Sequence, residues 1–149
     1  MKNMMLLVRN FKVFVLCSLL IVALSGCKDK NGVLNPYVTP GNVEDPGWVA
    51  NSGNMTVSMT AVIKVSFAKT EGSLAAFMGG KCCGVGVYNN GLYWLYISPD
   101  TETDGDVQLR FYSPELKRIF VAEEAIPFHN DTQLGTVSNP FTPYWIVAQ

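Results

Sequence analysis

Regular alternation of apolar and polar residues over 55–67 is the feature that most restricts the fold of this chain. Every second residue is apolar, namely Met55, Val57, Met59, Ala61, Ile63, Val65 and Phe67. The residues between them are polar except Val62. Because successive side chains of a strand point to opposite faces, this pattern predicts a long strand with one buried face.

Short segments with strand composition follow, separated by turn signals: 74–78, 83–88, 92–97, 107–112, 119–122, 126–128 and 144–147. Asn89-Asn90-Gly91 is typical of a hairpin turn, because Asn and Gly tolerate positive φ. The best helical candidate, 115–124, contains Ile119-Phe120-Val121, which favours a strand. The predicted fold class is therefore all-β, an antiparallel β-sandwich of about seven or eight short strands, Ig-like or jelly-roll-like. A small barrel is the alternative.

The first 26 residues have the pattern of an export signal. Three basic residues precede a nearly unbroken apolar run over 13–24. As a helix this run would rise about 18 Å, which is too short for a hydrocarbon core of about 30 Å. Leu24-Ser25-Gly26-Cys27 follows and resembles the lipobox of bacterial lipoproteins. The resemblance implies removal of 1–26 and diacylation of Cys27, whereas an ordinary signal peptide that happens to contain a Cys is the alternative.

The remaining chain divides into a lipidated, flexible tether over 27–47, rich in Pro and Gly turn signals, and a β-sandwich domain over 48–149. Three of the eleven basic residues and none of the twelve acidic ones lie in 1–26, so the remainder carries a net charge of −4. Nucleic acid is therefore not an expected partner. Lys28, following Cys27, favours the outer membrane under the sorting rule of enteric bacteria. The side of that membrane is left open.

Residues 73–85, Ser-Leu-Ala-Ala-Phe-Met-Gly-Gly-Lys-Cys-Cys-Gly-Val, resemble a motif of uncharacterised bacterial secreted and lipoprotein modules. Its usual form is D-x-[IL]-A-A-F-V-G-D-E-C-R-G-V, preceded by a Trp and by a strand that contains Met. The resemblance covers about 48–141 and implies a compact β-sandwich, often one module of a larger cell-surface protein. Ser73 and Cys83 replace the acidic residue and the Arg of that motif, so a ligand bound by the Arg is not implied.

An acidic segment is the only candidate for a metal site. Asp100, Glu102, Asp104 and Asp106, with Gly105 at the sixth position, resemble the start of a calcium loop. The twelfth position is Phe111, where such a loop needs a bidentate Glu. An exposed acidic turn is therefore favoured, a weak Ca²⁺ site is the alternative, and no other cofactor is expected.

Catalytic constellations are sparse, so no catalytic residue is assigned and the chain is not expected to be an enzyme. His129 with Asp131 is the only conceivable general-base pair, and Gly-x-Ser-x-Gly is absent. Cys82 and Cys83 are adjacent, so in a strand they face opposite ways and do not easily form a disulfide. With one His in the chain, they also fall short of a zinc ligand set.

Strand aromatics are the better lead to function, with Tyr93, Trp94, Tyr96 and Trp145 as candidate ligand-binding residues. Flat rings with polar tips suit sugar rings, and they suit a core or a protein interface equally well. Because Tyr93 and Trp94 face opposite ways, one of them is expected to be exposed. The first hypothesis is a membrane-anchored, non-catalytic surface module that binds glycan or polysaccharide. The second is a structural or protein–protein module, an adhesin-like accessory of other envelope proteins.

Overall fold

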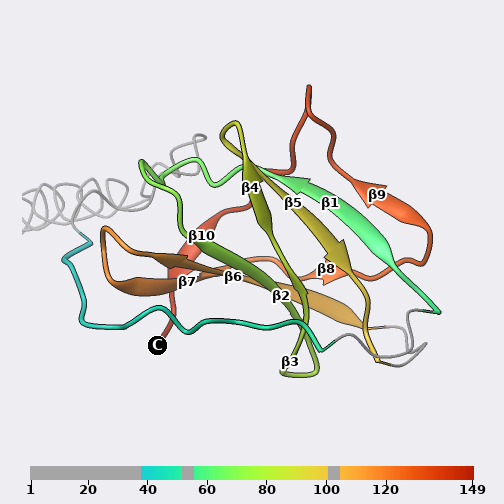
Figure 1. The fold of residues 1–149 in the computed structure, drawn as a ribbon, viewed down its shortest axis with the longest axis horizontal. Helices are drawn as coiled ribbons and strands as arrows, with labels where there is room; N and C mark the ends of the chain where they lie inside the picture. The colour runs from blue at the N-terminus through green and yellow to red at the C-terminus, as the bar shows by residue number, and fades with distance from the viewer. Residues whose placement is uncertain (1–37, 52–55, 101–104) are drawn as a thin grey trace, which may run out of the picture.

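The alternating segments form strands in the computed structural model, which describes residues 38–51, 56–100 and 105–149. These ranges contain no helix and ten strands in two sheets (Figure 1), which confirms the all-β sandwich. The strands are β1 (Met59–Ile63), β2 (Ser73–Met78), β3 (Lys81–Val85), β4 (Val87–Asn89), β5 (Leu92–Ile97), β6 (Asp106–Ser113), β7 (Arg118–Ala122), β8 (Ile126–Pro127), β9 (Thr132–Leu134) and β10 (Trp145–Val147). The number of strands exceeds the predicted seven or eight because the predicted segment 83–88 is divided between β3 and β4, and because β9 was not predicted.

The first sheet has four strands in the order β4-β5-β1-β9. β1 pairs antiparallel with β5, with Thr60 opposite Tyr96 and Val62 opposite Trp94. On its other side β1 pairs with β9 in parallel, with Thr60 opposite Gln133. The sandwich is therefore antiparallel except at this one ladder among the described strands, where the chain returns to β1 from a distant part of the sequence.

The second sheet has the order β10-β7-β6-β2-β3, with β8 pairing at the start of β6. Its central strand β6 is the longest, with eight residues, and it alternates inward Val107, Leu109 and Phe111 with outward Gln108 and Arg110. The two sheets face each other, and their inward side chains form the core.

The predicted segment 83–88 divides at Gly86, where the chain leaves the six-stranded sheet and enters the four-stranded one. At this crossing β3 passes close to β5. A Cβ on Gly84 would lie 2.6 Å from the backbone oxygen of Tyr96, so a larger residue cannot be accommodated without a shift. The hairpin that follows is confirmed at Asn90 (φ 49°) and Gly91 (φ 81°), both in the left-handed region.

The long strand predicted over 55–67 is shorter than expected, because only Met59–Ile63 forms β1. Its partner β5 has six residues, and beyond Ile63 the backbone N–H of Lys64 donates instead to the oxygen of Phe141. The predicted facing is nevertheless correct, since Met59, Ala61, Ile63 and Val65 are buried in the core. Residues 52–55 lie outside the described ranges.

Aromatic rings around Phe111 join the two sheets. The Phe111 ring centroid lies 5.7 Å from that of Phe67, 5.8 Å from that of Tyr93 and 6.0 Å from that of Trp145. These rings come from the turn after β1, from β5 and from β10. Each aromatic pair of this kind adds about 0.5–1.5 kcal/mol to the free energy gained by burial.

Residues 38–51, which we call the strap, run along the outward face of the six-stranded sheet (Figure 1, cyan to green). The backbone N–H groups of Gly41 and Val43 donate to the oxygens of Leu116 and Lys117 in the β6–β7 turn. The Tyr112 hydroxyl donates to the Val43 oxygen. The described end of the expected tether is thus hydrogen-bonded to the sheet.

Farther along, the strap reaches β2 and β3. The Ser73 hydroxyl donates to the Asp45 carboxylate, and the Trp48 ring packs edge-on against Phe77 with centroids 5.6 Å apart. The Asn51 N–H donates to the Cys82 oxygen. Ala75 and Phe77 are buried here although the register places them on the outward face of β2, beside Arg110 and Gln108.

Replacing Phe111 by Ala should lower the free energy of unfolding by about 3–5 kcal/mol, because the fully buried ring contacts elements of both sheets. Urea denaturation of residues 28–149 measures this. Val49→Ala is the control, since Val49 is the most exposed large apolar residue of the strap and its loss should change stability by less than about 0.5 kcal/mol. Equal effects of the two substitutions would contradict the central role of Phe111.

Candidate functional site

The outward face of the four-stranded sheet presents two aromatic side chains from β5. Trp94 is 42% exposed and Tyr96 is 48% exposed, whereas the alternating residues Tyr93, Leu95 and Ile97 are buried. This confirms that one of Tyr93 and Trp94 is exposed, and it identifies Trp94 as that residue. Trp94 lies opposite Val87 of β4 and Val62 of β1, and Tyr96 lies opposite Thr60.

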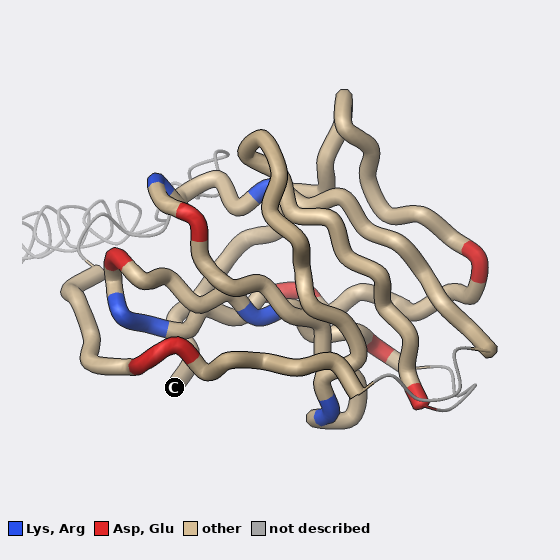
Figure 2. Tube along the Cα trace, viewed as in Figure 1, with Lys and Arg blue, Asp and Glu red and all other residues tan. Residues whose placement is uncertain are grey.

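A shallow hollow of about 370 Å³ lies at these side chains, and we call it the aromatic hollow. The described residues that line it come from the four strands of this sheet and from the end of β3, and they include no charged one: Thr60, Ala61, Val62, Val85, Val87, Trp94, Leu95, Tyr96 and Gln133. None of the four strands of this sheet contains Lys, Arg, Asp or Glu (Figure 2). Apolar contact and uncharged hydrogen bonds are therefore what this face offers a ligand.

Two of the four candidate aromatics are wrong as ligand-binding residues, because both are buried in the core. Tyr93 is only 2% exposed, and its hydroxyl donates to the Gly72 oxygen at 3.0 Å and accepts from the Gly72 N–H at 2.8 Å. Burial raises the pKa of Tyr93. Trp145 is 3% exposed and packs against Phe111 and Phe67. Period-two alternation places neighbours on opposite faces but does not say which face is inside.

A second, polar hollow of about 300 Å³ adjoins the first and is lined by Ser58, Met59, Thr60, Asp131, Thr132 and Gln133. We call it the polar hollow. Of the residues that line the polar hollow, only Asp131 was singled out from the sequence, as half of a general-base pair, although the alternation over 55–67 already placed Ser58 and Thr60 on the polar face. Gln133 and Thr132 carried no signal, because β9 has three residues without apolar alternation.

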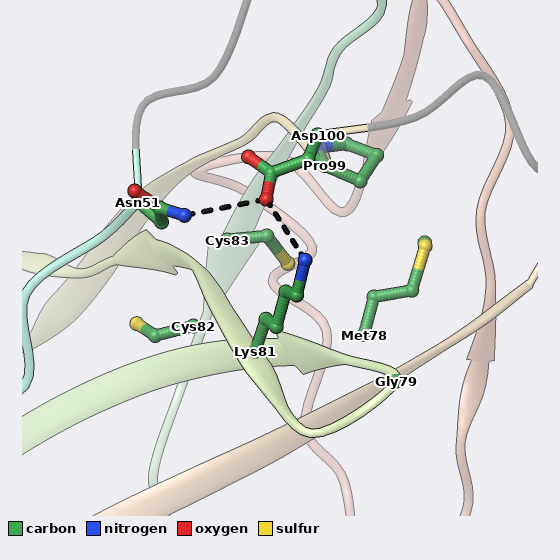
Figure 3. A pocket seen from close by; sticks show the side chains of 8 residues that line it. All are labelled: Asn51, Met78, Gly79, Lys81, Cys82, Cys83, Pro99 and Asp100. Carbon is green, nitrogen blue, oxygen red and sulfur yellow. Dashed lines mark hydrogen bonds and ion pairs between the residues drawn. The ribbon is translucent and has the colours of Figure 1, made fainter.

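The acidic segment does not assemble a metal site among the described residues. Asp100 accepts from the Lys81 ammonium at 3.4 Å and from the Asn51 amide at 3.3 Å (Figure 3). A cation at Asp100 would have to compete with Lys81. No group of three His, Cys, Asp or Glu side chains with the geometry of a metal site occurs within the described ranges. Glu102 and Asp104 lie outside those ranges, and Asp106 is exposed at the start of β6.

Cys82 and Cys83 line a small pocket of about 180 Å³ next to Lys81 and Asp100 (Figure 3). Both are free thiols, and their sulfur atoms point different ways, as the strand geometry predicts. Burial raises the pKa of Cys82, and burial together with the neighbouring Cys82 raises the pKa of Cys83 to about 11. Thiols held protonated in this way are poor nucleophiles at neutral pH.

Among the described residues, no hydrogen bond or ion pair joins the His129 ring to the Asp131 carboxylate of the candidate base pair. The Asp131 carboxylate accepts from the neighbouring Asn130 amide at 3.2 Å, and the His129 backbone oxygen accepts from the Thr132 hydroxyl at 2.7 Å. His129 and Asp131 thus lie two positions apart in one turn without forming a general-base pair. Cys27, the expected lipidation site, lies outside the described ranges.

Comparison with known proteins found no protein-family model, no curated protein and no solved structure that matches the chain. The described part of the chain forms no helix with the length and hydropathy needed to cross a membrane. We therefore infer function from the chemistry of the exposed side chains.

The raised thiol pKa values predict slow alkylation of Cys82 and Cys83. At pH 8 a smaller fraction of each thiol is ionised in the folded protein than in the unfolded chain, so iodoacetamide should react several-fold more slowly with folded residues 28–149. The same protein in urea is the matched control, because it keeps both thiols and loses the burial. Equal rates in the two states would contradict the pKa shifts.

Proposed function

We propose that this protein is a non-catalytic, envelope-anchored module that binds glycan through the outward face of its four-stranded sheet. The observation that carries the proposal is the pair Trp94 and Tyr96, both exposed on one uncharged face with hydroxyl and amide groups beside them. A sugar ring has an apolar C–H face that packs on an aromatic ring and a rim of hydroxyl groups that need hydrogen-bond partners. Both kinds of partner occur in the aromatic hollow.

The exposed apolar side chains of the aromatic hollow also support a binding function. Val85, Val87, Trp94 and Tyr96 are all exposed and all line the same hollow, so they form a patch rather than scattered residues. Patches of this kind on soluble domains commonly mark binding sites. The chain supplies no covering segment for this face among the described residues, in contrast to the strap on the other sheet.

Alanine at Trp94 or Tyr96 should weaken glycan binding about tenfold or more, because each substitution removes a flat apolar surface from the hollow. A glycan and polysaccharide array of residues 28–149 finds the ligands, and titration calorimetry on a positive one measures the loss. Tyr144→Ala is a matched control, since Tyr144 is likewise 42% exposed but immediately precedes β10 of the other sheet. Binding that survives both substitutions unchanged would refute the proposal.

A protein partner is the second candidate, and a specific feature of β4 favours it. β4 is an edge strand of three exposed residues, Val87, Tyr88 and Asn89, and it has no charged side chain. Natural sheet edges are usually protected by charges or by Pro, so an uncharged edge can accept a further strand from a partner. Co-purification of envelope proteins with the detergent-extracted full chain, lost on Val87→Lys, would favour this candidate.

Anchoring through Cys27 forms part of the same proposal. Cells that express the full chain with an alkyne analogue of palmitate should label it, and Cys27→Ser should abolish the label, because the thiol is the acceptor. Cys17→Ser is the matched control, since Cys17 lies within the segment expected to be removed. Undiminished label in the Cys27→Ser chain would exclude this anchor.

A further inference from the structure

The aromatic hollow and the polar hollow are two parts of one groove. Thr60 and Gln133 line both of them. Thr60 lies opposite Tyr96 on one side and opposite Gln133 on the other, so these three residues share one row on the same face of the sheet. The row crosses from β5 over β1 to β9.

The two parts differ in chemistry. The aromatic hollow offers Trp94 and Tyr96, whereas the polar hollow offers the Ser58 hydroxyl and the Asp131 carboxylate. One Asp131 oxygen accepts from the Asn130 amide, and a carboxylate has further acceptor sites for ligand hydroxyls. The Gln133 amide donates one N–H to the Gly135 oxygen, which leaves its second N–H and its carbonyl oxygen for a ligand.

We propose that this groove takes an uncharged glycan chain of at least two sugar units, laid across β5, β1 and β9. The inference rests on the proposed function and names its ligand class. One unit packs on Trp94 and Tyr96, and the next forms hydrogen bonds with Gln133 and Asp131. Neighbouring strands are about 4.8 Å apart, so the groove spans about 10 Å from β5 to β9, longer than one sugar ring.

Charge favours a neutral chain over an acidic one. Asp131 is the only charged residue among the described residues that line either hollow. Asp100, which is paired with Lys81, follows β5, the strand that runs antiparallel to β1, and so lies toward the same end of the sheet as Ser58. Lys64, after β1, is at the opposite end. A uronate or sulfate in the polar hollow would face the Asp131 carboxylate, and no Lys or Arg is among the described residues that line this hollow, so the contact is unfavourable.

Titration of the full chain in detergent with gluco- and manno-oligosaccharides of one to six units tests the length requirement. Affinity should rise about tenfold from one unit to two or three and then level off. Gln133→Ala should remove about threefold to tenfold of that gain, the loss expected for one hydrogen bond, so that affinity rises less steeply with chain length.

Asp131→Asn tests the charge argument without disturbing the turn, because Asp131 has φ 57° and Asn tolerates that conformation. It should raise binding of oligogalacturonate relative to the neutral oligosaccharides about threefold or more. Glu124→Gln is the control, since it removes the same charge from an exposed residue just before β8 of the other sheet and should change neither ligand.

Three outcomes separate this inference from the function on which it rests. If neutral oligosaccharides bind and Trp94→Ala abolishes binding, but Gln133→Ala leaves the length dependence unchanged, the two-part groove is refuted and the glycan function stands. If oligogalacturonate binds the unsubstituted chain more tightly than the neutral probes, the ligand class is refuted. If no oligosaccharide or polysaccharide binds, the proposed function is refuted together with the groove.

Discussion

Packing of aromatic rings around Phe111 is the interaction on which the proposed binding face depends. Tyr93 is fixed inward by its ring contact with Phe111 and by two hydrogen bonds between its hydroxyl and Gly72. Because side chains alternate along a strand, fixing Tyr93 inward forces Trp94 and Tyr96 outward. One strand of six residues thus supplies part of the core and both exposed aromatics. A change that rotated Tyr93 out of the core would destroy the fold and the face together.

The outward faces of the two sheets differ in kind. The strap lies over part of the six-stranded sheet, where Ala75, Phe77 and Tyr112 are buried and the Arg110 guanidinium stacks 4.4 Å from the centroid of the Phe77 ring. The four-stranded sheet has no such cover among the described residues and no charge on its strands. Hydrophobic surface is thus buried on one side of the sandwich and left accessible on the other, which is the arrangement expected when one face is reserved for a ligand.

Local sequence predicted the parts of the fold that depend on local physics. The alternation over 55–67 gave the correct facing, and Asn90 and Gly91 adopt the positive φ that their turn requires. Trp145 was assigned wrongly because its exposure is decided by the sheet packed against it. β9 could not be predicted, since three residues pair in parallel with a strand about seventy positions earlier. Two of the four candidate aromatics, Trp94 and Tyr96, therefore lie at the candidate site. The polar hollow could not be predicted, because it forms only where β9 pairs with β1.

The strap also determines how the domain responds to force. A pull on the chain upstream of residue 38 acts first on Thr39, Gly41 and Val43, whose bonds to the β6–β7 turn and to Arg118 lie nearest that end. These contacts can break one after another while the hydrogen bonds between the strands of both sheets remain intact. Tension on a chain held at its N-terminus would thus uncover Tyr112 and then Phe77 before it reached Trp94. Strain at the proposed anchor would therefore be relieved in the strap before it reached the sheet proposed to bind glycan.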